Sequence, residues 1–170
     1  MADIHSFRDL RVYQELRRLH LRIHKLSLGF PQFELYELGS QIRRSSNAVP
    51  AIIAEGWGSR HTNIYLEAIN RAKGELRETQ HHLDIAHAKK YLSKQDWSDL
   101  DRAYENCDRM LEKLYQKLSE WRGSVRNPNT VYEDPAVYGQ TTTFADWEPI
   151  AEITLSVMAE FENHVKRGEV

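Results

Sequence analysis

Two apolar repeats, spaced by four and three residues, run through residues 65–86 and 97–121. Positions three or four apart share one face of an α-helix, so each repeat predicts a long amphipathic helix of about 24 residues. Thr62 or Asn63 is suited to cap the first helix, and Ser93 with Asp96 the second. The repeats consist of Tyr65, Ile69, Ala72, Leu76, Thr79, Leu83 and Ala86, and of Trp97, Leu100, Tyr104, Cys107, Leu111, Leu114, Leu118 and Trp121.

The N-terminal half predicts two more helices. One spans residues 6–28 and ends at Gly29-Phe30-Pro31, because proline cannot continue a helix. The other begins at Gln32 or Phe33 and ends at Gly56-Trp57-Gly58-Ser59. Pro50 is expected to kink this helix rather than end it, since the apolar pattern continues beyond it. The two apolar faces consist of Val12, Leu16, Leu19, Ile23 and Leu26, and of Leu35, Leu38, Ile42, Ser45, Val49, Ile52 and Ile53.

Together these segments predict an all-α fold, an antiparallel up-down-up-down four-helix bundle over residues 1–123. Long helices joined by short loops pack side by side at small crossing angles, which gives this arrangement. Cys107 lies in the apolar seam of the last helix, so we expect it to be buried and unreactive.

Residues 124–170 differ from the bundle in composition. Residues 1–126 carry 21 basic and 17 acidic residues, whereas residues 127–170 carry two basic and eight acidic ones. A stretch rich in Pro, Asn and Thr predicts a linker up to residue 143, and Asp146-Trp147-Glu148-Pro149 is typical of a helix start. We therefore predict a C-terminal extension, an acidic linker that ends in a fifth amphipathic helix. The apolar face of that helix consists of Ile150, Thr154, Val157, Met158, Phe161 and Val165.

The composition favours a cytoplasmic protein. No apolar run approaches the ~20 residues of a membrane-spanning helix, so no membrane association is expected. The first residues lack the basic start and apolar stretch of a secretory signal. The single cysteine excludes an internal disulfide framework and fits a reducing compartment.

Catalytic and metal-binding patterns are weak, and neither an enzyme nor a cofactor is expected. A di-iron bundle requires two Glu-x-x-His pairs and two further glutamates. Glu78 with His81 is one such pair, and no other helix completes the set. His20 and His24 have a chelating spacing but lie on the flank of their helix, where solvated or interface histidines are the better explanation.

Basic residues form a stripe on the first predicted helix. Arg11, Arg18, Arg22 and Lys25 fall within about 60° of one another on the helical wheel and extend over about 20 Å. Such a stripe can follow a phosphate backbone. The alternative is a solvated flank whose arginines pair with acids of a neighbouring subunit. Arg43, Arg44 and Arg60 add positive charge from the second helix and the turn after it.

Residues 7–121 resemble a family of small bacterial four-helix-bundle proteins that are encoded in intervening sequences of the large-subunit ribosomal RNA gene. The resemblance rests on short motifs in the first three predicted helices, of which the block from Arg43-Arg44-Ser45 to Glu55-Gly56-Trp57-Gly58 is the most specific. The other motifs are Phe7-x-Asp9-Leu10-x-Val12-Tyr13, Phe30-Pro31-x-x-Glu34, Tyr65-Leu66, Ala72-Lys73-Gly74-Glu75-Leu76-x-Glu78-Thr79 and His82-Leu83. Typical members end near residue 121, so the acidic tail is additional.

The resemblance implies an up-down-up-down bundle that assembles into a ring, a homopentamer. It also implies kinship with the accessory proteins of diversity-generating retroelements, which bind nucleic acid and a reverse transcriptase. It does not imply an enzyme. The role of the basic stripe is not part of the resemblance, because the first helix of the family is not always rich in arginine.

Two functions remain open at this point. The first is a non-catalytic oligomeric protein that binds RNA, DNA or a nucleic-acid-processing partner through arginines of the first two helices. The second is a protein-interaction scaffold whose tail helix docks on a neighbouring subunit or a partner. Glu55 is expected to be half-buried in a structural ion pair with Arg43, Arg44 or Lys73, because a buried carboxylate needs a partner.

Overall fold

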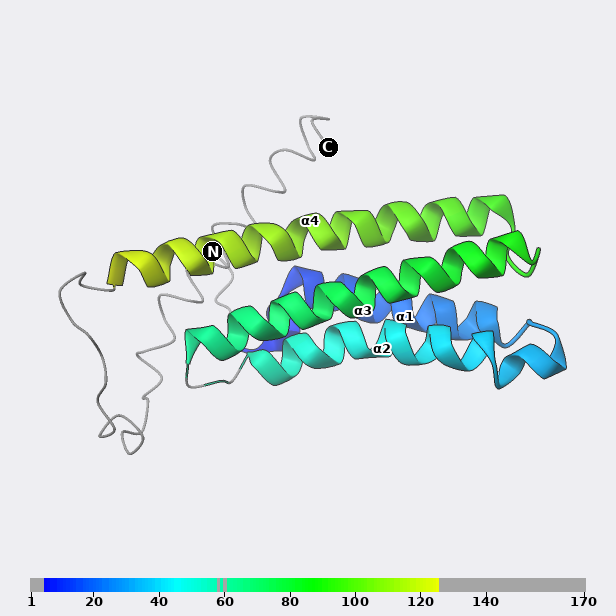
Figure 1. The fold of residues 1–170 in the computed structure, drawn as a ribbon, viewed down its shortest axis with the longest axis horizontal. Helices are drawn as coiled ribbons and strands as arrows, with labels where there is room; N and C mark the ends of the chain where they lie inside the picture. Colours follow the sequence, from blue (N-terminus) through cyan, green and yellow to red (C-terminus); the bar gives the residue numbers. More distant parts are fainter. Residues whose placement is uncertain (1–4, 58, 60, 126–170) are drawn as a thin grey trace.

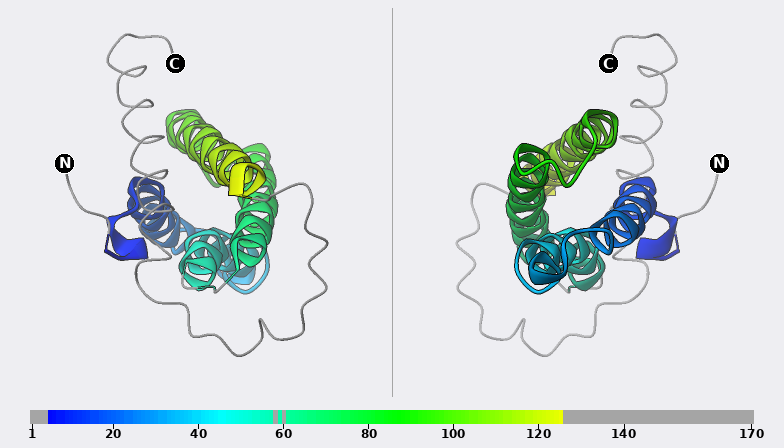
Figure 2. Two further views of the ribbon diagram at one scale, coloured as in Figure 1. Left: turned by 90° about the vertical axis from the view of Figure 1, so that its left-hand side faces the viewer. Right: turned by 90° about the vertical axis from the view of Figure 1, so that its right-hand side faces the viewer.

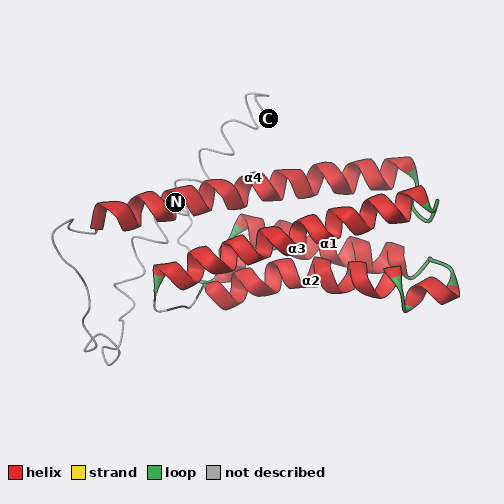
Figure 3. Ribbon diagram, in the orientation of Figure 1, coloured by secondary structure: helices red, strands yellow, loops and turns green. Residues whose placement is uncertain are grey.

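In the computed structural model, residues 5–57, 59 and 61–125 are described, with side chains up to residue 120. This part of the chain is helical and contains no strand, so the predicted all-α class is confirmed (Figure 3). None of its helices is long and apolar enough to cross a membrane. The elements are η1 (Phe7–Asp9), α1 (Arg11–Ser27), η2 (Gln32–Leu35), α2 (Leu38–Gly56), α3 (Thr62–Ala88) and α4 (Lys94–Val125).

The four long helices lie side by side, with the α1–α2 and α3–α4 connections at one end and the α2–α3 connection at the other (Figure 1). Seen end-on, they follow one another around the bundle in chain order (Figure 2). The contact between α2 and α3 is the most extensive of the four, and the contact between α1 and α4 is the smallest. The predicted fifth helix and nearly all of the predicted linker lie outside the described residues.

Four helix boundaries differ from the prediction. α3 begins at Thr62 with His61 as its N-cap and no side-chain hydrogen bond there, so neither Thr62 nor Asn63 caps it. The first helix is divided, because Ser6 and Asp9 form a capping box around η1 and Leu10 then adopts an extended conformation. The second begins later, at Leu38, because residues 32–35 form the short helix η2. The last continues to Val125, past the predicted end at residues 122–123. Ser93 caps α4 as predicted, since its Oγ accepts a hydrogen bond from the amide of Asp96 over 3.0 Å.

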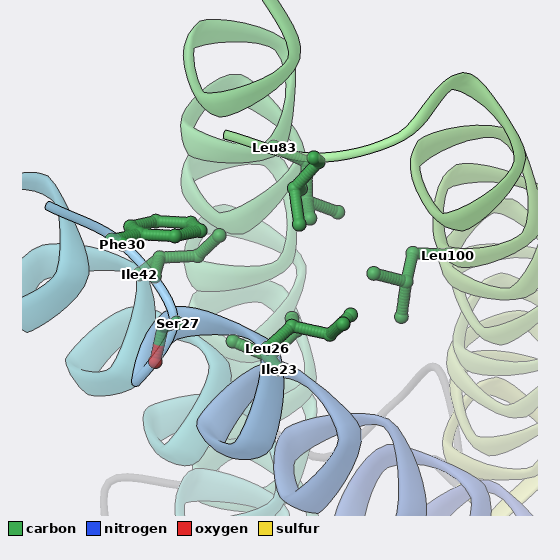
Figure 4. A pocket seen from close by; sticks show the side chains of 8 residues that line it. Ile23, Leu26, Ser27, Phe30, Ile42, Leu83 and Leu100 are labelled. Carbon is green, nitrogen blue, oxygen red and sulfur yellow. The ribbon is translucent and has the colours of Figure 1, made fainter. Parts of the chain in front are cut away.

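The apolar repeats of the sequence form the core. All seven predicted seam residues of α3 are buried, and so are the seam residues of α4 from Leu100 to Leu118. Leu26, Leu35, Leu38 and Trp97 are only partly buried at the margins. Apolar side chains of all four helices meet near the α1–α2 connection, where the remaining gap is too small for a water molecule (Figure 4).

Gly56 allows α2 to approach α3 closely. A Cβ atom at this position would lie 2.5 Å from Cβ of Ala68 and 3.0 Å from the ring of Tyr65. The glycine was expected only to end the helix, and its second role is to remove the side chain that would hold the two helices apart.

A layer of small polar residues crosses the bundle between α1, α2 and α3. The hydroxyl of Thr79 donates to Oγ of Ser45 over 3.0 Å, and both residues are fully buried. On the other side of α2, Nδ1 of His20 lies 2.9 Å from Oγ of Ser46. We call these four residues the polar layer. The three hydroxyl groups of this layer each have a hydrogen-bond partner, as buried polar groups require.

Candidate nucleic-acid interface

The basic stripe of α1 faces α4 at its C-terminal half. Arg22 donates a hydrogen bond to Asp96 over 2.8 Å and lies 3.7 Å from a carboxylate oxygen of Asp99. The side chain of Arg22 is 34% exposed. Two acids of α4 thus neutralise it within its own chain. This pairing differs from the alternative predicted from the sequence, in which the acids belong to a neighbouring subunit.

The other cations of the stripe are held less firmly. Arg18 pairs with Glu15 over 2.8 Å but remains 60% exposed. Such an exposed pair within one helix contributes little to stability, so the guanidinium can exchange it for another anion. Lys25 is exposed and has no ion pair within the described part of the chain. Arg11 is half-buried and has an interaction of its own.

The two neighbouring arginines of α2 have different surroundings. Arg43 points to the α1–α2 connection, where it donates to Oγ of Ser27 over 3.1 Å and to the carbonyl oxygen of Leu35 over 2.7 Å. It therefore holds the connection in place. Arg44 is exposed, and no described residue pairs with it. Arg60 lies outside the described residues.

The expectation of a half-buried Glu55 paired with Arg43, Arg44 or Lys73 is wrong. The side chain of Glu55 is 70% exposed, and its nearest cation is Arg71 at 4.0 Å. Lys73 points away from α2 toward α4, where it binds Glu112 and lies 3.7 Å from Asp108. The rotation of α3 that buries its apolar seam turns Lys73 toward α4, so the two side chains are not brought together.

Glu34, the acid of the family motif Phe30-Pro31-x-x-Glu34, binds residues of the α3–α4 connection. Its side chain is almost completely buried, accepts a hydrogen bond from Lys89 over 2.6 Å and another from the hydroxyl of Tyr91 over 3.2 Å. The hydrogen bond from Lys89 lowers the pKa of the Glu34 carboxyl, against the opposing effect of desolvation. This carboxylate joins the α1–α2 connection to the α3–α4 connection. The sequence could not predict this contact, because Lys89 and Tyr91 are 55 and 57 residues away from Glu34 along the chain.

The histidines do not assemble a metal site within the described residues. No group of three or more His, Cys, Asp or Glu side chains there is placed to hold a metal ion. Glu78, the acid of the single Glu-x-x-His pair, lies 3.4 Å from Nε2 of His82. Burial, and then the nearby His24, lower the pKa of His20, which belongs to the polar layer. Cys107 is buried as predicted, and burial raises the pKa of its thiol to about 12.

Comparison with known proteins agrees with the helical architecture. Among solved structures, the chain is similar to a protein of unknown function from the S23 ribosomal protein family of Bacteroides thetaiotaomicron. The identity is 19% and the TM-score 0.55, over 62% of this chain and 98% of that chain. At this identity the likeness concerns the fold alone. No curated protein matches the chain.

The family model of the 23S rRNA-intervening sequence proteins matches residues 8–113. The match covers more than half of the chain and extends from η1 into α4. It includes all the motifs on which the resemblance rests except the first residue of the opening one. The resemblance is thereby confirmed, and the chain belongs to the family of 23S rRNA-intervening sequence proteins.

Proposed function

We propose that this protein is a non-catalytic oligomer that binds nucleic acid, or a nucleic-acid-processing partner, through cations of α1 and α2. The observation that supports this function is that Arg18, Lys25 and Arg44 are exposed and have weak ion pairs or none among the described residues. Exposed cations with weak ion pairs or none can bind phosphates, because breaking such an ion pair costs little free energy.

The proposal divides the predicted site residues into two groups. Arg18, Lys25 and Arg44 bind phosphate, together with Arg11 and with Arg60, which lies outside the described residues. Arg22 and Arg43 stabilise the bundle through Asp96, Ser27 and the backbone of Leu35. The antiparallel up-down-up-down bundle acts as the rigid support on which these cations are spaced.

Assembly into a homopentameric ring in the cytoplasm is part of the same proposal. A ring repeats the basic surface of one subunit, and several weak phosphate contacts on one nucleic acid reinforce each other. Light scattering during size exclusion measures the assembly directly. One chain has a mass of 19.9 kDa, so a closed ring of five has a mass of ~100 kDa. A monomer at micromolar concentration contradicts the ring.

The central experiment measures binding of mixed-sequence RNA and single- and double-stranded DNA at several salt concentrations. We expect binding that weakens steeply with salt, with a slope set by the number of phosphate contacts. The variant Arg18→Glu, Lys25→Glu, Arg44→Glu is expected to lose binding and most of the salt dependence.

The matched control changes the same amount of charge elsewhere, in Arg77→Glu, Lys94→Glu, Arg102→Glu. These three residues are exposed on α3 and α4. The control is expected to retain most of the affinity, because its three cations lie outside the proposed interface. This result would show that net charge alone does not decide binding. Equal losses in both triple variants, or no binding by the unchanged protein, contradict the proposed interface. A reverse transcriptase is the partner to test next, by co-purification with the full chain.

A second function, a protein-interaction scaffold, is favoured by the α1–α2 connection. Leu28, Phe33 and Tyr36 in this segment are 57%, 68% and 83% exposed. Large apolar side chains close together on a surface are typical of protein docking sites. If Phe33→Ser and Tyr36→Ser abolish binding to a protein partner and leave nucleic-acid binding unchanged, the scaffold function is supported.

A further inference from the structure

The outer surface of α1 and α2 contains a groove that no described residue fills. It has a volume of about 280 Å³ and is lined by Phe7, Tyr13, Arg17, His20, Leu21, Asn47, Pro50, Ala51 and Ala54. Leu21 is 53% exposed although it lies in this lining. The small side chains on α2 leave the space, and the larger ones on α1 form its opposite wall.

The lining is apolar with a basic margin. Arg17 and His20 are its basic members, and no carboxylate lines it. Arg44 is exposed one turn before Asn47 along the wall formed by α2. The groove therefore fits an apolar surface flanked by negative charge. Its volume is below the usual range for small-molecule sites, which favours a few side chains inserted from a helix.

The C-terminal segment of the chain has these properties in its sequence. Residues 146–167 place the predicted apolar face, from Ile150 to Val165, on one side of a helix. Glu160 and Glu162 lie on opposite sides of that face, each about 100° from its centre. A second copy of the bundle is the poorer occupant, because residues 1–126 carry an excess of basic residues and residues 127–170 an excess of acidic ones.

The connection has the length to reach the groove. α4 ends at Val125 at the same end of the bundle as η1 and the last turn of α2, which border the groove (Figure 1). The ~20 residues between α4 and residue 146 can span up to about 65 Å. A segment tethered at this distance has a high effective concentration, so even weak docking is well populated.

We infer that residues 146–167 form an amphipathic helix that docks in the α1–α2 groove of its own chain. Its apolar residues fill the space beside Leu21, Pro50 and Ala51, and its glutamates lie beside Arg17 and Arg44. The tail then covers an apolar surface that would otherwise face solvent.

Cysteine cross-linking in the full-length protein tests this inference. The variant Ala51→Cys, Met158→Cys pairs the groove with the tail, and buried Cys107 does not compete. The control Arg102→Cys, Met158→Cys pairs the tail with an exposed position on α4 that the linker also reaches. Under a mild oxidant we expect a disulfide within one chain to form at least about tenfold faster in the groove variant.

A third variant adds Phe161→Asp to the groove pair and is expected to lose that advantage, while the helical signal and unfolding midpoint of the bundle stay the same. Equal rates in the groove and control variants overturn the inference. So does the absence of any cross-link, or a disulfide between two chains, which would place the tail on a neighbouring subunit. The reaction is followed without nucleic acid, so its outcome does not depend on the proposed function.

Discussion

Arg22 of α1 and Asp96 of α4 form a direct ion pair, with the guanidinium 2.8 Å from the carboxylate oxygen. The pair joins the two helices that have the smallest contact in the bundle. It also removes one arginine from the stripe that the sequence offers to nucleic acid. If Arg22 bound a phosphate, it would give up this ion pair, and the contact between α1 and α4 would lose stability.

We predict a measurable coupling energy between Arg22 and Asp96. In a double-mutant cycle with Arg22→Ala and Asp96→Ala, the interaction energy should be about 0.5–1 kcal/mol, because both side chains are partly exposed. The exposed pair Glu15 and Arg18 serves as the control and should give about 0.2–0.5 kcal/mol. Urea unfolding of the unchanged protein, and of the two single variants and the double variant of each pair, gives both values. A coupling near zero for the first pair would show that Arg22 is available for phosphate after all.

Glu34 should make the protein sensitive to acid. Its pKa is lowered in the folded state, chiefly by the hydrogen bond from Lys89, from an ordinary value of 4.5. The stabilisation is therefore present above pH 4.5 and is lost as the pH falls through the lowered pKa. Glu34→Gln should unfold at a lower temperature than the unchanged protein at pH 7, and this difference should shrink in acid. Thermal unfolding followed by circular dichroism at pH 7, 5 and 3 tests this. A constant difference at all three values contradicts the prediction.

Gly56→Ala should destabilise the protein by about 1–3 kcal/mol, because the new Cβ meets Ala68 and Tyr65 in a packed contact. Gly74→Ala is the matched control. Gly74 lies inside α3 with nothing within 4 Å of an added Cβ, so alanine there should stabilise the helix by about 0.5–1 kcal/mol. Chemical denaturation measures both changes, and effects of the same sign would refute the argument from close approach.

Lys90→Gly should stabilise the protein by about 0.5–1 kcal/mol. Lys90 has a φ of 62° after the end of α3, a conformation that glycine adopts at less cost. The amide of Lys90 donates to the carbonyl of His87 and that of Tyr91 to the carbonyl of Ala86, so the end of α3 is closed by the backbone. Ala88→Gly, two residues earlier and still helical, should instead destabilise by about 0.5–1 kcal/mol. Unfolding curves of the two variants should shift in opposite directions.

Cys107 should react slowly with thiol reagents in the folded protein. It is 1% exposed, and burial raises its thiol pKa to about 12, so the thiolate is scarce at neutral pH. Labelling by an aromatic disulfide should speed up greatly in denaturant, where the thiol is exposed. Fast labelling of the folded protein at pH 7 would contradict the buried position.

The helices and the core could be predicted from the sequence because the apolar spacing carries that information. The seams of α3 and α4 are the clearest case. The pairing of charges could not be predicted, because it depends on how each helix is rotated against its neighbours. Lys73 and Arg43 belong, like Glu55, to the family motifs and were expected to pair with it. In the structure Lys73 points to α4 and Arg43 to the α1–α2 connection. The break at Leu10 between η1 and α1 was not predicted, and its cause is local. The capping box of Ser6 and Asp9 stabilises a separate short helix at residues 7–9 in place of one continuous helix.

The polar layer limits how far the helices can slide along one another. An apolar repeat of three and four residues is nearly unchanged by a shift of seven positions, about 10 Å along a helix axis. Such a shift would leave the core of α3 apolar but would break the hydrogen bond between Thr79 and Ser45, and each hydroxyl would keep only its bond to a backbone carbonyl of its own helix. Two directional contacts of α2, one on each side, thus select a single axial register among alternatives that the apolar residues alone would accept.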